Sequence, residues 1–85
     1  MRTFDYTITD EIGLHARPAG QLAKQVKGYE SIVTLTCREK TVELKKLMAV
    51  MALAVKKGET VTIKVEGPDE DKAAAELEEY FKANV

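Results

Sequence analysis

Hydrophobic and polar residues alternate in four short stretches of the chain, and each stretch predicts a β-strand with one buried face. In the first stretch Phe4, Tyr6 and Ile8 alternate with polar residues, and we expect this strand to run to about Thr9. Three later stretches repeat the alternation and contain many β-branched residues, which favour strands. They cover residues 32–37, 40–44 and 60–66. The pattern therefore predicts four strands.

Apolar residues recur every three or four positions after residue 16, which is the spacing of a helix with one buried face. They are Ala19, Leu22, Ala23 and Val26. We expect a helix from Ala16 to Lys27, with Pro18 in the first turn, where a missing N–H is tolerated. Gly28 is expected to end the helix in the left-handed conformation.

Two further helices are expected in the second half of the chain. Residues 47–52 are too few and too apolar for a free-standing helix, so they should lean on the sheet, with Val50 and Leu53 towards the core. Asp69 is in position to cap a last helix with an acidic first turn and a Glu78 to Lys82 pair one turn apart. The inward stripe of that helix consists of Ala73, Leu77, Tyr80 and Phe81.

The predicted order of elements is βαββαβα. Strands with one apolar face and amphipathic helices bury their apolar sides against each other, so this order predicts a two-layer α+β sandwich. The order of the strands in the sheet does not follow from the pattern. The two-residue link Arg38-Glu39 suggests a hairpin, although tight hairpin turns favour Asn-Gly or Asp-Gly because both central residues need positive φ. We expect another type of turn or a strained one.

Length and composition limit the class of protein. The 85 residues fit one domain spanning residues 1–85, and the net charge of −1 argues against a general nucleic-acid binder. Cys37 is the only cysteine, so no internal disulfide is expected and a reducing cytoplasm fits. The N-terminus has no apolar signal core, and no stretch approaches the roughly 18 apolar residues of a membrane span, so we expect a cytoplasmic protein without membrane insertion.

The only histidine of the chain, His15, stands where the first helix begins. As the N-cap it would lie beside the backbone N–H groups of Ala16 and Arg17, which have no partner within a helix, and beside the Arg17 guanidinium. Such a site suits a phosphate, and the positive field favours a neutral, nucleophilic imidazole. The spacing alone equally allows a weak cap or a solvated loop residue.

Two separated motifs resemble one known family. Residues 13–19 read Gly-Leu-His-Ala-Arg-Pro-Ala, and residues 42–51 read Val-Glu-Leu-Lys-Lys-Leu-Met-Ala-Val-Met, followed by Lys57-Gly58 and by Gly67-Pro68-Asp69. Together they resemble the HPr family, the histidine-containing phosphocarriers of the bacterial sugar phosphotransferase system, over nearly the whole chain. The resemblance implies an open-faced sandwich whose antiparallel sheet has the order 1-4-2-3 and is covered on one side by three helices.

The resemblance also implies a function. Enzyme I, charged from phosphoenolpyruvate, would phosphorylate His15 on Nδ1, and the group would pass to a sugar-specific enzyme IIA domain. His15 and Arg17 would act in the transfer, and Ala16 and Arg17 would bind the phosphate. The protein would be a covalent carrier within a relay and not a stand-alone enzyme. No nucleotide loop or acidic cluster for Mg²⁺ is present in the sequence, so neither a cofactor nor a metal is expected.

The resemblance further implies a surface on which enzyme I and the IIA domain dock one after the other. For such transient contacts we expect a monomer. Its apolar members would be Leu14, Gly20, Leu47, Met48 and Met51, and its steering lysines Lys24, Lys27, Lys45 and Lys46. Each of these features also has a plain structural interpretation: methionine stripes usually belong to a core, and lysines usually form a solvated helix face.

Lys46 departs from the family, because many members carry a serine there that a regulatory kinase phosphorylates. A lysine cannot accept that phosphate, so we expect no such inhibition. This difference favours, as an alternative function, a regulatory or nitrogen-branch paralogue that receives phosphate at His15 without feeding sugar uptake. A small binding module without phosphoryl chemistry is the third possibility.

Overall fold

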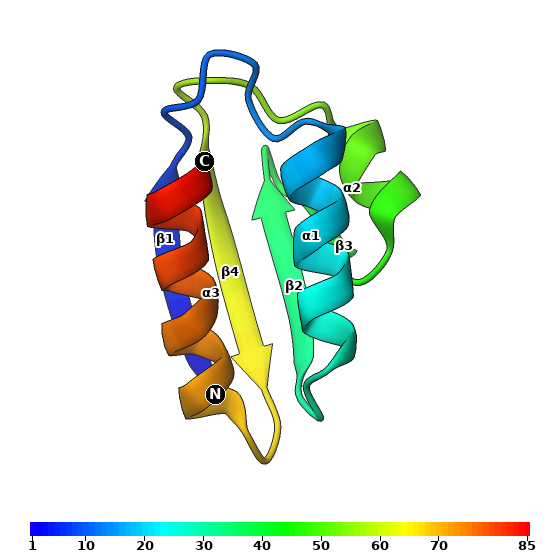
Figure 1. Cartoon of the computed structure of the whole chain (residues 1–85), viewed down its shortest axis with the longest axis vertical. Coiled ribbons are helices and arrows are strands. Elements are labelled where there is room, and N and C mark those ends of the chain that lie inside the picture. Colours follow the sequence, from blue (N-terminus) through cyan, green and yellow to red (C-terminus); the bar gives the residue numbers. More distant parts are fainter.

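Four antiparallel strands form one sheet, and three helices pack against it (Figure 1). The computed structural model describes all 85 residues. The strands are β1 (Arg2–Thr7), β2 (Ile32–Cys37), β3 (Lys40–Glu43) and β4 (Thr60–Glu66), in the order β1-β4-β2-β3. The helices are α1 (Ala16–Lys27), α2 (Leu47–Leu53) and α3 (Glu70–Asn84). The βαββαβα order and the open-faced α+β sandwich are thereby confirmed.

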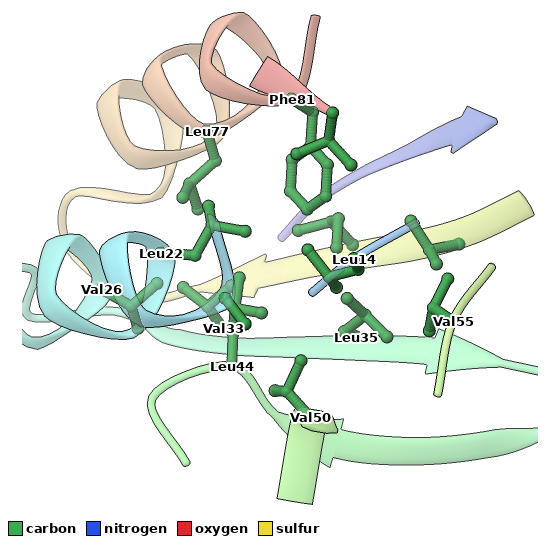
Figure 2. Packing of buried hydrophobic residues seen from close by; sticks show 14 of the residues in the cluster. Leu14, Leu22, Val26, Val33, Leu35, Leu44, Val50, Val55, Leu77 and Phe81 are labelled. Atoms are coloured by element: carbon green, nitrogen blue, oxygen red, sulfur yellow. The ribbon is translucent and has the colours of Figure 1, made fainter. Parts of the chain in front are cut away.

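The alternation along the strands decides which face of the sheet is covered. Val33 and Leu35 of β2 and Ile63 of β4 are buried under the helices, whereas the threonines between them lie on the opposite, uncovered face. Of the 24 buried residues, 20 form a single core cluster. Figure 2 shows Leu22 and Val26 of α1 and Leu77 and Phe81 of α3 directed into this core.

The start of α1 and the end of α3 lie at the same end of the molecule. The start of α1 and the end of α3 both lie at the top in Figure 1, where the loop after β1 also passes. The N–H groups of Thr9 and Asp10 donate to the main-chain oxygen of Val85, at 2.9 and 2.7 Å, and so tie this loop to the end of α3. These bonds also explain why β1 ends at Thr7 and not near Thr9.

The other element boundaries agree with expectation to within one residue, but the end of α1 does not have the predicted conformation. Gly28 has φ −83° and ψ −7°, which is right-handed, so the predicted left-handed stop is wrong. The chain leaves the helix through two further right-handed turns, in which Gly28 donates to the carbonyl of Gln25 and Tyr29 to that of Val26. Glycine is therefore not required there for its φ angle.

The hairpin between β2 and β3 uses two non-glycine residues in the left-handed region. Arg38 has φ 51° and Glu39 has φ 66°, so the strained form of the turn is the one present. The Arg38 guanidinium bonds to the Glu59 carboxylate and to the carbonyl of Leu53, at the end of α2. These charge-assisted bonds hold the turn in place from outside the hairpin.

Asp69 precedes α3 as predicted, but its side chain does not cap that helix. The carboxylate accepts the backbone N–H groups of Glu30 and Ser31, both at 3.0 Å, and the hydroxyl of Ser31. The Ser31 hydroxyl and these N–H groups lower the pKa of Asp69. Asp69 therefore joins the loop after α1 to the turn after β4.

Asp69→Asn is expected to destabilise the fold at neutral pH, because the amide is a weaker acceptor for three donors than a carboxylate. The folded state lowers the pKa of Asp69, so the ionised carboxylate stabilises the fold at pH values above the ordinary carboxyl pKa. This stabilisation is lost as the pH falls below about 4 and the carboxylate becomes protonated. Urea unfolding at pH 7 and at about pH 3 measures this. The gap between wild type and variant should shrink in acid, whereas Asp71→Asn, at a carboxylate 82% exposed, should change little at either pH. An equal loss at both pH values would contradict the assignment.

Candidate functional site

His15 is the residue immediately before α1 and occupies the N-cap position with an extended backbone, φ −92° and ψ −175°. Its side chain makes no capping hydrogen bond and is 31% exposed. The ring is therefore not used to close the helix end, and it is accessible from solvent.

Two backbone donors beside the ring have no acceptor within the protein. The N–H groups of Ala16 and Arg17 make no hydrogen bond, Pro18 has no N–H, and the first closed bond of the helix runs from Ala19 to the carbonyl of His15 at 3.0 Å. Both free donors belong to the positive end of a helix dipole. This arrangement can bind an anion attached to the imidazole.

The side chain of Arg17 lies in the same surface pocket as His15. The pocket is lined mostly by polar residues from the loop, from α1 and from α3, namely Asp10, His15, Arg17, Pro18, Gln21, Tyr80 and Asn84. Burial raises the pKa of Tyr80, and the nearby Arg17 charge opposes this effect. The Tyr80 hydroxyl donates to the side-chain oxygen of Gln21 and links α3 to α1. The site is thus assembled from three segments of the chain.

The backbone around Gly13 aims the chain at this position. Gly13 has φ +80°, and a Cβ atom there would lie 2.4 Å from the carbonyl oxygen of Val55. The next residue, Leu14, donates its N–H to that same oxygen at 2.9 Å, and its side chain is 4% exposed. Figure 2 shows Leu14 within the core, near Leu35 and Phe81. Because the side chain is buried, the expectation that Leu14 forms part of a docking face is wrong; it anchors the loop.

Asp10 is a site residue that sequence reasoning missed. Its Oδ2 lies 3.9 Å from Nε2 of His15, and its Oδ1 accepts the backbone N–H of Ile12 at 2.8 Å. A signal was present in the sequence, because an aspartate three residues before a glycine is typical of a tight turn in which the aspartate side chain bonds the backbone. The pattern showed the turn but not that the second carboxylate oxygen faces the histidine.

The other expected docking residues lie on α1, on α2 and on the segment before α2. Met48 is 79% exposed and Leu47 37%, whereas Met51 and Gly20 are half-buried. The helices α1 and α2 pack against each other, so these residues share one region of the surface. Leu47 and Met48 are thus exposed apolar side chains, whereas Met51 packs against the core.

The four lysines of this region are all exposed but differ in their partners. Lys24 and Lys27 lie in the last turn of α1 and form no ion pair. Lys45 and Lys46 both pair with Glu43, with N to O distances of 3.7 and 3.2 Å, and these lysines lower the pKa of Glu43. The segment before α2 therefore presents a weaker positive field than two free lysines would.

Comparison with known proteins gives a family for this fold and site. The family model described as the phosphotransferase system HPr component phosphorylation site matches residues 2–83. The chain belongs to the HPr family. It is 47% identical over 73 residues to the phosphocarrier protein HPr of Mycoplasma capricolum subsp. capricolum, covering 86% of this chain and 82% of that one. HPr proteins are phosphocarriers of the phosphotransferase system, and the motifs around His15 and before Met51 are family motifs.

Solved HPr structures have the same architecture. The structure of a Mycoplasma histidine-containing phosphocarrier protein superposes with a TM-score of 0.90 at 42% identity, covering 93% of this chain and 90% of that one. The Bacillus subtilis catabolite-repression protein Crh, described as a dimer with a swapped domain, superposes with a TM-score of 0.77 at 34% identity, covering 94% and 92%. In the present structure no helix is both long and apolar enough to cross a membrane.

Proposed function

We propose that this HPr protein accepts a phosphoryl group from phosphorylated enzyme I on Nδ1 of His15 and passes it to a sugar-specific enzyme IIA domain. The observation that carries the proposal is the pair of unbonded N–H groups, those of Ala16 and Arg17, next to an imidazole that caps nothing. A phosphoryl group on His15 carries about two negative charges, which two backbone donors and the Arg17 guanidinium complement.

The missing donor at Pro18 is part of this function. A helix start with three or more free N–H groups would bind the phosphorylated state more tightly, and a carrier that is stabilised too far transfers its group slowly. The two N–H donors and the guanidinium bind the phosphoryl group from one side only. Its other side faces solvent and is accessible to a partner. Uptake and release are thus both served by one site.

The partners dock, in this proposal, on the patch formed by Gly20, Leu47, Met48 and Met51, with Lys24, Lys27, Lys45 and Lys46 attracting acidic surfaces. The protein works as a monomer in the cytoplasm, as a single domain that engages each partner in turn. It uses neither a cofactor nor a metal, and it is a carrier within a relay and not an enzyme by itself.

Incubation with enzyme I and phosphoenolpyruvate tests the function. The protein should gain the mass of one phosphoryl group, the label should be labile in acid and stable in base, and it should move to at least one enzyme IIA domain from a panel. A protein that gains no label is a binding module of another kind. A protein that is labelled but discharges to no IIA domain is the regulatory paralogue.

Met48→Asp is expected to slow both phosphoryl uptake from enzyme I and discharge to a IIA domain at least tenfold, because a charge in the apolar centre of an interface is costly. The stability of the fold should not change, because Met48 is 79% exposed. Initial rates of labelling by enzyme I and of discharge to a IIA domain measure the effect. Ile32→Asp is the matched control, because Ile32 is 63% exposed but lies on the uncovered face of the sheet. Equal rates for the two variants would place the docking surface elsewhere.

The regulatory paralogue is the second candidate, and Lys46 favours it. Lys46 stands directly before α2 and pairs with Glu43 at 3.2 Å, so the position carries a permanent charge in place of a phosphorylatable hydroxyl. A protein that the regulatory kinase cannot phosphorylate at this position suits a branch of the phosphotransferase system that is regulated in another way. Transfer to the panel of IIA domains separates this candidate from the sugar carrier.

A further inference from the structure

The carboxylate of Asp10 is fixed against the imidazole of His15 by the turn that precedes α1. The backbone N–H of Asp10 donates to Val85 at 2.7 Å, and its carbonyl accepts the N–H of Gly13 at 3.0 Å. One carboxylate oxygen accepts the N–H of Ile12 at 2.8 Å, which leaves the other, Oδ2, directed at Nε2 of His15 at 3.9 Å. Both the backbone and the side chain of Asp10 are therefore restrained, and the restraint selects one of the two ring nitrogens.

We propose that Asp10 is a positioning residue that keeps a proton on Nε2 of His15 throughout the phosphoryl cycle. The inference rests on the proposed function, since it assigns Asp10 a part in the reaction at the same ring. A carboxylate beside one nitrogen of an imidazole favours the form that carries hydrogen on that nitrogen. The lone pair is then on Nδ1, the nitrogen that takes the phosphoryl group in the proposed function.

In the uptake step no proton has to move. The lone pair of Nδ1 attacks phosphorus, the Nδ1–P bond forms, and the bond between phosphorus and the donor atom of enzyme I breaks with its electron pair returning to that atom. The product ring on His15 carries a phosphoryl group on Nδ1 and hydrogen on Nε2, and it is formally positive. The carboxylate of Asp10 stabilises that positive charge.

In the release step the proton on Nε2 determines whether the ring leaves as neutral imidazole or as an anion. When Nε2 carries hydrogen, breaking the Nδ1–P bond returns the electron pair to Nδ1 and the ring leaves as neutral imidazole. When Nε2 has lost its proton, the ring would have to leave as an imidazolate anion, which is a far poorer leaving group. Asp10 therefore makes the phosphorylated protein a better donor at pH values where the ring would otherwise deprotonate.

The other groups around the ring do not supply this charge. Arg17 of α1 and the helix start are positive and oppose a charged imidazole, and Tyr80 of α3, whose pKa burial raises, contributes a neutral hydroxyl. Asn84 and Gln21 are uncharged amides. Asp10 contributes the single carboxylate side chain that lines the pocket, so the effect is assigned to one residue.

Asp10→Asn tests the proposal, because the amide oxygen can still accept the N–H of Ile12 while the charge is lost. Nitrogen NMR of His15 at about pH 8.5, where an ordinary imidazole is neutral, reports which nitrogen carries hydrogen. The share of the Nε2–H form should fall in the variant. Spontaneous release of phosphate from the phosphorylated protein should slow about fivefold at that pH, as expected for one partly exposed charge at about 4 Å.

Glu11→Gln is the matched control, since it removes the same charge from the neighbouring position, where the carboxylate pairs with Lys57 at 2.6 Å. It should leave both measurements unchanged. Asp10→Ser, whose hydroxyl can take over the Ile12 bond, provides a second uncharged variant if the asparagine disturbs the turn. Wild-type values in both Asp10 variants, or the same change in Glu11→Gln, would overturn the proposal. If the wild type takes up no phosphoryl group, the proposed function is wrong, while the NMR measurement still decides whether Asp10 controls the ring.

Discussion

His15→Ala is expected to abolish phosphoryl uptake from enzyme I and to leave the fold intact. His15 is the only histidine, so its removal takes away the one imidazole nucleophile of the chain. The ring makes no capping bond and is 31% exposed, so the free energy of unfolding should change by about 1 kcal/mol or less. Intact-mass measurement after incubation with enzyme I and phosphoenolpyruvate shows the first effect, and urea unfolding shows the second.

The control for this variant is Asn84→Ala, which changes another side chain of the same pocket. Asn84 bonds to the carbonyl of Tyr80 at 3.1 Å and has no place in the proposed chemistry, so uptake should persist. If His15→Ala still acquired an acid-labile phosphoryl group, the site assignment would be wrong. If it unfolded instead, the view that the ring plays no structural part would have to be abandoned.

Gly13→Ala is expected to have the largest effect on stability among the site variants. Its Cβ would be placed 2.4 Å from the carbonyl oxygen of Val55, at a φ of +80° that side chains rarely adopt. Overlap and backbone strain together should cost about 2–4 kcal/mol. Moving the backbone to relieve the overlap would break the hydrogen bond from the N–H of Leu14 to the carbonyl of Val55 and displace His15. Labelling by enzyme I should therefore also slow. Unfolding curves and initial labelling rates measure the two consequences.

Gly20→Ala is the matched substitution at a glycine that has none of these constraints. Gly20 is inside α1, and a Cβ atom there meets nothing within 4 Å. Alanine should therefore stabilise the helix by about 0.5–1 kcal/mol. A loss of stability in both variants would mean that the loop geometry at Gly13 is not the cause of its effect.

The arrangement of elements was predictable because the hydrophobic pattern acts locally. Alternation along β2 and β4 and the spacing after Ala16 gave the elements in the correct order, since each pattern fixes which side chains can be buried together. The strand order came only through the resemblance of motifs to a family, because the pattern within each strand does not determine which strand lies beside it.

The interactions that the sequence did not predict join residues far apart in the chain. Asp69 was expected to cap its own helix, yet it bonds to Ser31, 38 positions away, and Arg38 reaches the carbonyl of Leu53. No periodicity shows which distant donors a carboxylate or guanidinium will meet. The error at Leu14 has a similar origin: one apolar residue inside a loop motif has no pattern around it from which burial can be inferred.

The site was predicted in part for the same reason. A helix start after His15 follows from local spacing, and so does the pair of free N–H groups, because Pro18 fixes the first turn. That Tyr80 and Asn84 line the pocket depends on where the end of α3 packs, which only the fold determines. Asp10 lies between these cases, since its spacing to Gly13 is typical of a turn, whereas the position of its second carboxylate oxygen depends on the fold.

The most direct test of the central claim is phosphorus and nitrogen NMR of the protein after phosphorylation by enzyme I, followed by addition of an enzyme IIA domain. We predict a single phosphorus signal coupled to Nδ1 of His15, which disappears as the IIA domain becomes labelled. A phosphorus bonded to Nε2 or to any other residue, or the absence of any signal, would contradict the account.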